Sequence, residues 1–306
     1  MKSTVTIKKV TYRGWKNCCR ISNGKVELIV TADVGPRVIR FGFIGGQNLF
    51  KEYDAQLGKR SGKAWRIYGG HRLWHAPEDA KRTYFPDNFP VPVEQHAGTA
   101  RFIQSVETTT GIQKEIEIKL APNRASVELV HRLRNTGAWP VELAPWALSV
   151  MAPGGTGIIP LPARGSHPKD LLPGNLLTLW LYTDMSDRRW TWGRQYILLR
   201  QDSSPKSQPQ KLGALVPDGW AGYALNGQLF VKKFACFAGA NYADYGCNFE
   251  TFTNHEMLEV ETLGPFTKIA PGQTVEHTET WSLFDNVPAP ECDRDVTQHV
   301  LPNVRR

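Results

Sequence analysis

The feature that most constrains this chain is the two-residue period of its apolar side chains, interrupted at short intervals by glycine and proline. Residues 115–120 and 126–134 alternate apolar and polar side chains, as extended strands with one buried face do. Residues 25–30, 257–263 and 275–284 are further strand candidates, and residues 225–230 predict a hairpin around Asn-Gly. Many short strands joined by such turns predict an all-β sandwich or barrel that is mostly antiparallel.

The length of 306 residues would suit two average domains, but large β-sandwiches often form one unit. Residues 201–211 are polar and contain proline, yet strand patterns resume on both sides, so we expect an exposed loop there. Residues 286–306 are weakly patterned and are expected to lie over the surface as a tail. We therefore predict a single domain over residues 1–306.

The net charge of +8 raises the question of an anionic partner, but the basic residues are scattered and reach their highest density only at residues 59–63. The sequence contains no RNA-binding signature, zinc finger or helix-turn-helix pattern, so we predict no nucleic acid partner. An anionic sugar, such as a uronic acid or a sugar phosphate, stays open as a ligand.

Hydropathy and cysteine spacing argue against a membrane protein and against a cysteine-based zinc or redox site. No run of 18 apolar residues and no apolar leader occur, so we expect no membrane partner and a cytoplasmic location. The five cysteines form no CxxC pair, which argues against a thiolate zinc site or a redox motif.

A dense group of polar and aromatic residues follows Gly69-Gly70, and it contains His71, Arg72, Trp74 and His75. A sugar site needs this mixture, because aromatic faces pack on the ring while polar groups bind the hydroxyls. A buried structural turn is the alternative. The two histidines have the four-residue spacing of helical metal ligands, but Gly69-Gly70 and a following proline leave little room for a helix. We predict no metal and no cofactor.

Carboxylates recur in a later strand candidate, where Glu259 and Glu261 share one face and Leu258, Val260 and Thr262 share the other. The glutamates lie either on a solvated face or in a cleft where one acts as a general base. Glycoside hydrolases use a pair of carboxylates, and Glu250 and Asp87 are further candidates for such a pair beside Glu259 and Glu261. Tyr84 and Asp87 belong to an aromatic, polar loop at residues 82–90, which either contacts a ligand or is simply held by its aromatic side chains.

Four stretches together resemble a branch of the galactose mutarotase-like superfamily related to the aldose 1-epimerases, over roughly residues 20 to 285: ADVGPRVIRFGFIGGQNLF, YGGHRLWHAPE, MLEVETLGPF and IAPGQTVEHTETWSLF. The resemblance implies a large antiparallel β-supersandwich with a sugar site on a concave sheet. It also implies an isomerase in which a glutamate takes the proton of the anomeric hydroxyl and a histidine protonates the ring oxygen.

Carried over residue by residue, the resemblance makes Glu261 the base, with Glu259 as the alternative register, and His71 the match to the first family histidine. The further residues expected to contact the sugar are Arg37, Asn48, Arg72, Trp74, Tyr84, Asp87, Trp146, Glu250 and Glu259.

The second family histidine is absent, because residues 142–148 carry Trp146 where the family has an Asn-His-x-Tyr-Phe stretch. A tryptophan stacks on a sugar but cannot protonate a ring oxygen, so His71, His75 or His131 would have to act as the acid, or the chemistry differs. Three functions stay open for a small-molecule carbohydrate ligand: an epimerase-like isomerase, a non-catalytic sugar-binding module, and a glycan hydrolase or lyase.

Overall fold

The computed structural model describes residues 5–96 and 98–305, and strands dominate this part of the chain. The strands form two large antiparallel sheets. The first sheet has the order β1 (Thr6–Tyr12), β2 (Trp15–Ser22), β3 (Val26–Val30), β4 (Val38–Phe43), β5 (Gly70–Ala76), β10 (Val141–Met151), β19 (Leu258–Leu263), β18 (Phe249–Thr253), β15 (Gln210–Ala214) and β12 (Leu177–Leu179), with β20 (Thr267–Ile269) paired to β10.

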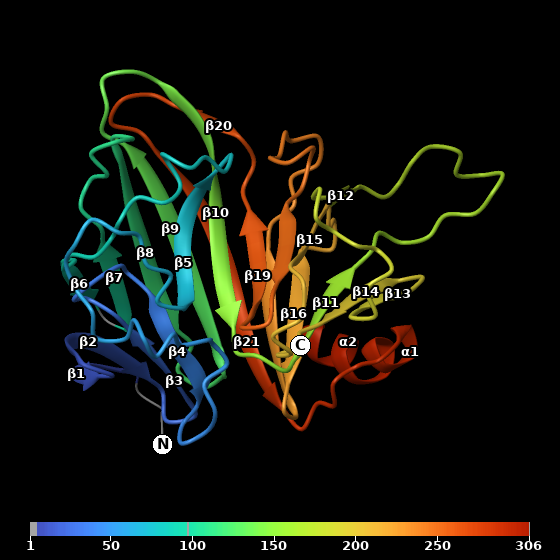
Figure 1. The fold of residues 1–306 in the computed structure, drawn as a ribbon, viewed down its shortest axis with the longest axis horizontal. Coiled ribbons are helices and arrows are strands. Elements are labelled where there is room, and N and C mark those ends of the chain that lie inside the picture. The colour runs from blue at the N-terminus through green and yellow to red at the C-terminus, as the bar shows by residue number, and fades with distance from the viewer. Residues whose placement is uncertain (1–4, 97, 306) are drawn as a thin grey trace.

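The second sheet has the order β13 (Trp190–Trp192), β14 (Tyr196–Arg200), β11 (Thr156–Pro160), β16 (Trp220–Leu225), β17 (Gln228–Phe234), β21 (Thr274–Asp285), β9 (Ser126–Asn135), β8 (Ile112–Leu120), β7 (Thr99–Ile103) and β6 (Val93–His96). The segment between β11 and β12 projects from the body of the protein, and the C-terminal helices lie on the same side (Figure 1). The fold is therefore all-β, as the alternation of side chains predicted.

The main core lies between the two sheets and is centred on aromatic side chains. Phe41 and Phe50 from the first sheet side contact Phe230 and Trp281 from the second, with ring centroids 5.5–6.2 Å apart across these contacts. Each ring is fully or almost fully buried, and such burial stabilises a fold by about 1.5–3 kcal/mol per large side chain. This packing holds the two sheets face to face.

Most of the sequence-based strand predictions are confirmed. The alternating stretches at 115–120 and 126–134 lie in β8 and β9, and the stretches at 257–263 and 275–284 coincide with β19 and β21. The Asn-Gly hairpin joins β16 to β17, where Asn226 and Gly227 have φ values of 48° and 77°. Two positive φ angles in succession are what a tight two-residue hairpin turn requires.

The tail differs from the prediction. Residues 293–304 are helical, with α1 (Asp293–Asp295), a π-helical turn (Val296–Val300) and α2 (Leu301–Val304). Val296, Val300 and Val304 recur every four residues and pack in a second core with β11, β14, β16 and β17. Asp293 anchors the segment by accepting hydrogen bonds from the backbone N–H groups of residues 194–196. None of the described helices is long and apolar enough to cross a membrane.

Candidate functional site

The site is built on the outer face of β5, β10 and β19, the face turned away from the second sheet. In the strand register Leu148 lies opposite both Arg72 and Glu261, and Trp146 lies opposite Trp74. Directly opposed residues in an antiparallel sheet share a face, so these side chains form one surface.

The Gly69-Gly70 turn lets β5 start in close contact with its neighbours. Both glycines have positive φ, and a Cβ on Gly70 would lie 2.3 Å from the carbonyl oxygen of Val38. Only a residue without a side chain fits there, which explains why the polar segment follows two glycines.

A pocket of about 280 Å³ opens on the outer face. Its lining residues are Trp65, Ile67, Arg72, Trp74, Glu78, Tyr84, Trp146, Leu148, Tyr182, Lys211, Phe252, Met257 and Glu259. Two larger hollows, of about 630 and 530 Å³, lie along residues 160–175. The arginines that line them, Arg164, Arg194 and Arg305, are exposed, whereas in the smaller pocket buried charges and aromatic rings converge. A few polar groups that converge among aromatic side chains are characteristic of ligand sites.

The walls of the pocket are aromatic. Trp74 has ring centroid distances of 5.7 Å to Trp65, 5.2 Å to Tyr84 and 5.3 Å to Trp146, all with inclined ring planes. The hydroxyl of Tyr84 donates a short hydrogen bond to Glu78 at the rim. Rigid ring faces next to hydrogen-bonding groups suit a ligand with apolar C–H faces and hydroxyl edges.

Arg72 and Glu259 form the polar part of the pocket wall. The Nη2 of Arg72 donates to Oε1 of Glu259 over 3.1 Å, and the guanidinium lies 4.2 Å from the ring centre of Trp74. Among the described residues, Nε and Nη1 of Arg72 have no hydrogen-bond partner although the side chain is 2% exposed. A buried donor without a partner is costly, so these two N–H groups are ready for an oxygen acceptor.

Beneath the pocket lie two fully buried glutamates bridged by a lysine. Glu250 and Glu261 face each other across β18 and β19, and the Nζ of Lys211 lies 2.8 Å from Oε2 of Glu250 and 3.7 Å from Oε2 of Glu261. Oε2 of Glu261 also accepts a hydrogen bond of 2.8 Å from Nε1 of Trp146. The Oε1 atoms of both glutamates lack a hydrogen-bond partner in the described part of the chain.

Burial changes the acid strengths of these groups. Burial and the nearby carboxylates raise the pKa of Glu250 well above its ordinary value, and burial raises the pKa of Glu261 to about 7. Although burial opposes its charge, the carboxylates of Glu261 and Glu250 raise the pKa of Lys211. Two carboxylates beside one ammonium thus share a proton near neutral pH.

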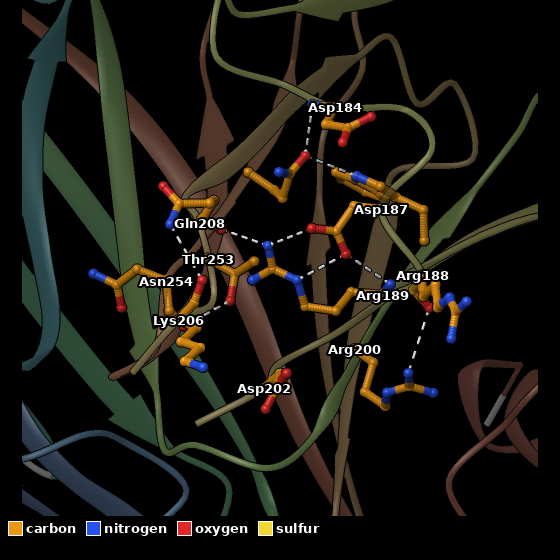
Figure 2. A network of polar contacts seen from close by, with 12 residues as sticks. Asp184, Asp187, Arg188, Arg189, Arg200, Asp202, Lys206, Gln208, Thr253 and Asn254 are labelled. Atoms are coloured by element: carbon orange, nitrogen blue, oxygen red, sulfur yellow. Dashed lines mark hydrogen bonds and ion pairs between the residues drawn. The ribbon is translucent and has the colours of Figure 1, made fainter. Parts of the chain in front are cut away.

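The segment that carries Tyr182 to the pocket is tied down by a polar network (Figure 2). Arg189 donates from Nε and Nη2 to the two carboxylate oxygens of Asp187, at 3.0 and 2.7 Å, and also to the carbonyl of Gln208. The backbone N–H of Asp184 donates to the side chain of Gln210, next to Lys211. The network therefore connects the Tyr182 segment to the strand that holds the lysine.

His71 and His75 lie on the opposite face of β5 from Arg72 and Trp74. His71 is fully buried between the sheets, with Nε2 2.8 Å from Nε2 of His131 and Nδ1 2.9 Å from the hydroxyl of Ser149. His75 is also buried, with Nε2 3.6 Å from Glu107. Alternation along one strand separates both histidines from the face that carries Glu261.

Between the sheets, the ring nitrogens of His71 and His131 are all engaged in hydrogen bonds. Nδ1 of His131 donates to the carbonyl of His277, so its Nε2 accepts from His71, and His71 in turn accepts from Ser149. One nitrogen each of His71 and His131 and an oxygen of Glu279 lie within 4.8 Å of one another, as a metal site would require. However, the ammonium of Lys232 lies 3.0 Å from Glu279 and already balances its charge.

Three of the predicted sugar contacts have other partners. Arg37 forms a bidentate ion pair with Asp87, and both side chains are buried or nearly so. The side-chain amide of Asn48 bonds to the backbone of Phe41, Phe50 and Ile39 and closes the turn after β4. None of the three lines the pocket.

Of the remaining predictions, Arg72, Trp74, Tyr84, Trp146 and Glu259 line the pocket, while Glu250 and Glu261 lie beneath it. Sequence reasoning missed Lys211, Trp65 and Tyr182. A lone lysine in a strand and aromatic residues in loops carry no pattern, and only the pairing of β15 with β18 brings Lys211 to the glutamates.

Comparison with solved structures identifies the fold. A galactose mutarotase-like protein from Lactobacillus casei superposes with a TM-score of 0.57 at 11% identity, covering 88% of this chain and 100% of that one. A candidate aldose 1-epimerase from Klebsiella pneumoniae gives a TM-score of 0.60 at 10% identity, covering 92% and 83%. The chain has the galactose mutarotase-like fold.

The galactose mutarotase-like fold also occurs within larger proteins. The chain superposes on 48% of a TPR-domain containing protein from Parabacteroides distasonis, with a TM-score of 0.57 at 12% identity and 89% of this chain covered. It therefore spans about half the length of that protein. No protein-family model matches the sequence, and no curated protein matches it.

Proposed function

We propose that this chain is a sugar isomerase of the aldose 1-epimerase type, with the outer-face pocket as its monosaccharide site. The observation that carries the proposal is the pair of buried glutamates, Glu250 and Glu261, directly beneath an aromatic-walled pocket. A base that works at neutral pH needs a pKa near 7, and burial gives Glu261 such a value.

In this proposal the sugar ring packs on Trp74 and Trp146, while Arg72 and Glu259 bind its hydroxyls. Glu261 takes the proton of the anomeric hydroxyl through Oε1, the oxygen that lacks a partner among the described residues. The ring opens, the aldehyde end rotates, and the ring closes on the other face.

The proposed ligand is an uncharged sugar. Both cations of the pocket already have carboxylate partners, Arg72 with Glu259 and Lys211 with Glu250. Glu78 at the rim adds a further carboxylate. Among the residues that line the pocket, each cation is thus already balanced by a carboxylate, which favours an uncharged ligand over a phosphate or a uronate.

The test measures exchange between α and β anomers by NMR saturation transfer over a panel of aldoses. We expect the wild-type protein to accelerate the exchange of at least one sugar, and Glu261→Gln to reduce that acceleration by about 100-fold or more, because the amide cannot accept the proton. Glu117→Gln on β8, in the other sheet, is the matched control and should behave as wild type. Acceleration of no sugar would refute the isomerase.

A non-catalytic sugar-binding role is the second candidate. It is favoured by the absence of a histidine among the residues that line the pocket. Calorimetric binding of a sugar, lost in Trp74→Ala, together with an unchanged anomer exchange rate would support this role instead.

A further inference from the structure

Lys211 occupies an unusual position for a lysine, because it lines the pocket and yet is 7% exposed at its side chain. Its Nζ lies 4.9 Å from the ring centre of Trp146 and 4.5 Å from that of Trp180, so two aromatic faces confine it. The ammonium therefore lies among two rings and two buried carboxylates, on a side chain that lines the pocket.

The carboxylates beneath Lys211 outnumber the cation. If Glu250 and Glu261 were both ionised, the group would carry a net negative charge where none of the three side chains has appreciable contact with water. Burying an unbalanced charge is costly, so one of the two carboxyls keeps its proton. Glu250 has Lys211 as its nearest ionic partner, whereas Glu261 also accepts the indole N–H of Trp146, which stabilises its ionised form. The proton therefore belongs on Glu250.

We propose that Lys211 is the catalytic acid of the isomerase, donating a proton to the ring oxygen of the sugar, and that Glu250 supplies that proton by returning one to Lys211. This inference rests on the function proposed above. No histidine is among the residues that line the pocket, and the proposal gives the protonation of the ring oxygen to a lysine on β15.

Protons balance over the cycle. As Glu261 takes the proton of the anomeric hydroxyl, the C1–O5 bond breaks, a carbonyl forms at C1, and O5 takes a proton from the ammonium of Lys211. Glu250 then gives its carboxyl proton to the resulting amine. The net change is one proton moved from Glu250 to Glu261 through the substrate, and ring closure reverses each transfer. Lys211 is charged before and after each half of the cycle.

The charged and titratable groups that act on this set come from several elements: Arg72 on β5, Glu259 on β19, and Asp244 in the loop before β18. Arg72 is balanced by Glu259, at 3.1 Å. Glu250 therefore responds to Lys211, Glu261 and Asp244, and Glu261 responds to Lys211, Glu259 and Arg72.

The first experiment compares Lys211→Met and Lys211→Arg with wild type in the anomer exchange assay. Methionine keeps the length of the side chain without the charge, and arginine keeps the charge but does not release a proton at any accessible pH. We expect kcat to fall about 100-fold or more in both variants, with KM changed less than about threefold. Lys119→Met, an exposed lysine on β8, is the control and should leave both constants unchanged.

The second experiment tests Glu250, which acts only through Lys211. In Glu250→Gln the carboxyl that returns a proton to Lys211 is gone, and with it the group whose deprotonation lowers activity at high pH. We expect a lower kcat together with loss of the alkaline limb of the pH–rate profile that Glu250 causes, a change that a merely structural residue would not cause. Because glutamine replaces a protonated carboxyl with a group of the same shape, the fold should persist, and circular dichroism checks this.

The outcomes separate the two proposals. Wild-type acceleration with full kcat in Lys211→Met or Lys211→Arg would overturn the acid role while leaving the isomerase intact. An alkaline limb that persists unchanged in Glu250→Gln would overturn the role of Glu250 as the proton source. A wild-type protein that accelerates no sugar would overturn the isomerase and this inference with it.

Discussion

A buried histidine between the sheets makes the stability of the folded protein depend on pH, and a single substitution isolates its contribution. His277 lies on β21, is buried, and has Nε2 2.8 Å from the hydroxyl of Thr262. That hydroxyl donates to Glu279, so it accepts the Nε2–H of His277, and the imidazole is neutral. Burial lowers the pKa of His277 from 6.5 to about 4. The perturbation is His277→Gln, which keeps an N–H donor but does not titrate.

The direction in which stability changes with pH follows from the state, folded or unfolded, that binds the proton. Between pH 6.5 and about 4 the unfolded chain carries a proton on His277 and the folded chain does not, so the histidine lowers stability progressively as the pH falls. The gap between 6.5 and about 4 corresponds to about 3 kcal/mol. Whatever His277→Gln costs at pH 7, that cost should be about 3 kcal/mol smaller at pH 4.

Chemical denaturation at a series of pH values, with linear extrapolation to water, measures the difference between the two proteins. Comparing the proteins is essential, because Glu261, with its raised pKa, gains a proton in the folded state first and so shifts the wild-type curve in the opposite direction. That contribution cancels in the difference. A pH-independent difference for His277→Gln would refute the neutral buried imidazole.

Three further predictions follow from the same structure. Lys232→Met leaves Glu279 charged and unbalanced in the core, so we expect a loss of about 3–5 kcal/mol in denaturation experiments, partly recovered when Glu279→Gln is added; an unchanged stability would contradict the ion pair. If Glu261 is the base, kcat/KM for anomer exchange should fall as the pH drops below about 7, and a flat profile down to pH 5 would exclude it. Arg189→Ala removes the anchor of the Tyr182 segment, so we expect KM to rise several-fold with kcat nearly unchanged in the same assay; an unchanged KM would show that the segment does not contribute to binding.

The sequence determined the fold class, because side-chain alternation is a local property. The strands around residues 115–134 and 257–284 were predicted from alternation, and the glycine and proline turns predicted their spacing. The short helical segment at residues 293–304 was not predicted, because its three valines at four-residue spacing form too weak a local pattern. In the folded protein these valines pack on the second sheet.

Alternation also placed Glu259 and Glu261 on one face of β19, but it left open whether that face meets water. Only the neighbouring strands, which bring Trp146 and Lys211 over Glu261, show that both glutamates are buried. The same alternation could have separated His71 from Arg72, yet the sequence does not state which side of β5 faces the second sheet.

What only the tertiary structure decided is which distant residues meet. Lys211, Glu250, Glu261 and Arg72 lie on four different strands, and their contacts depend on the order β5-β10-β19-β18-β15. Strand order is set by the packing of whole sheets rather than by any local pattern. The sequence could therefore supply the sandwich and most of the glutamates and aromatic residues, whereas the partner of those glutamates, and the face on which each histidine lies, came from the assembled sheets.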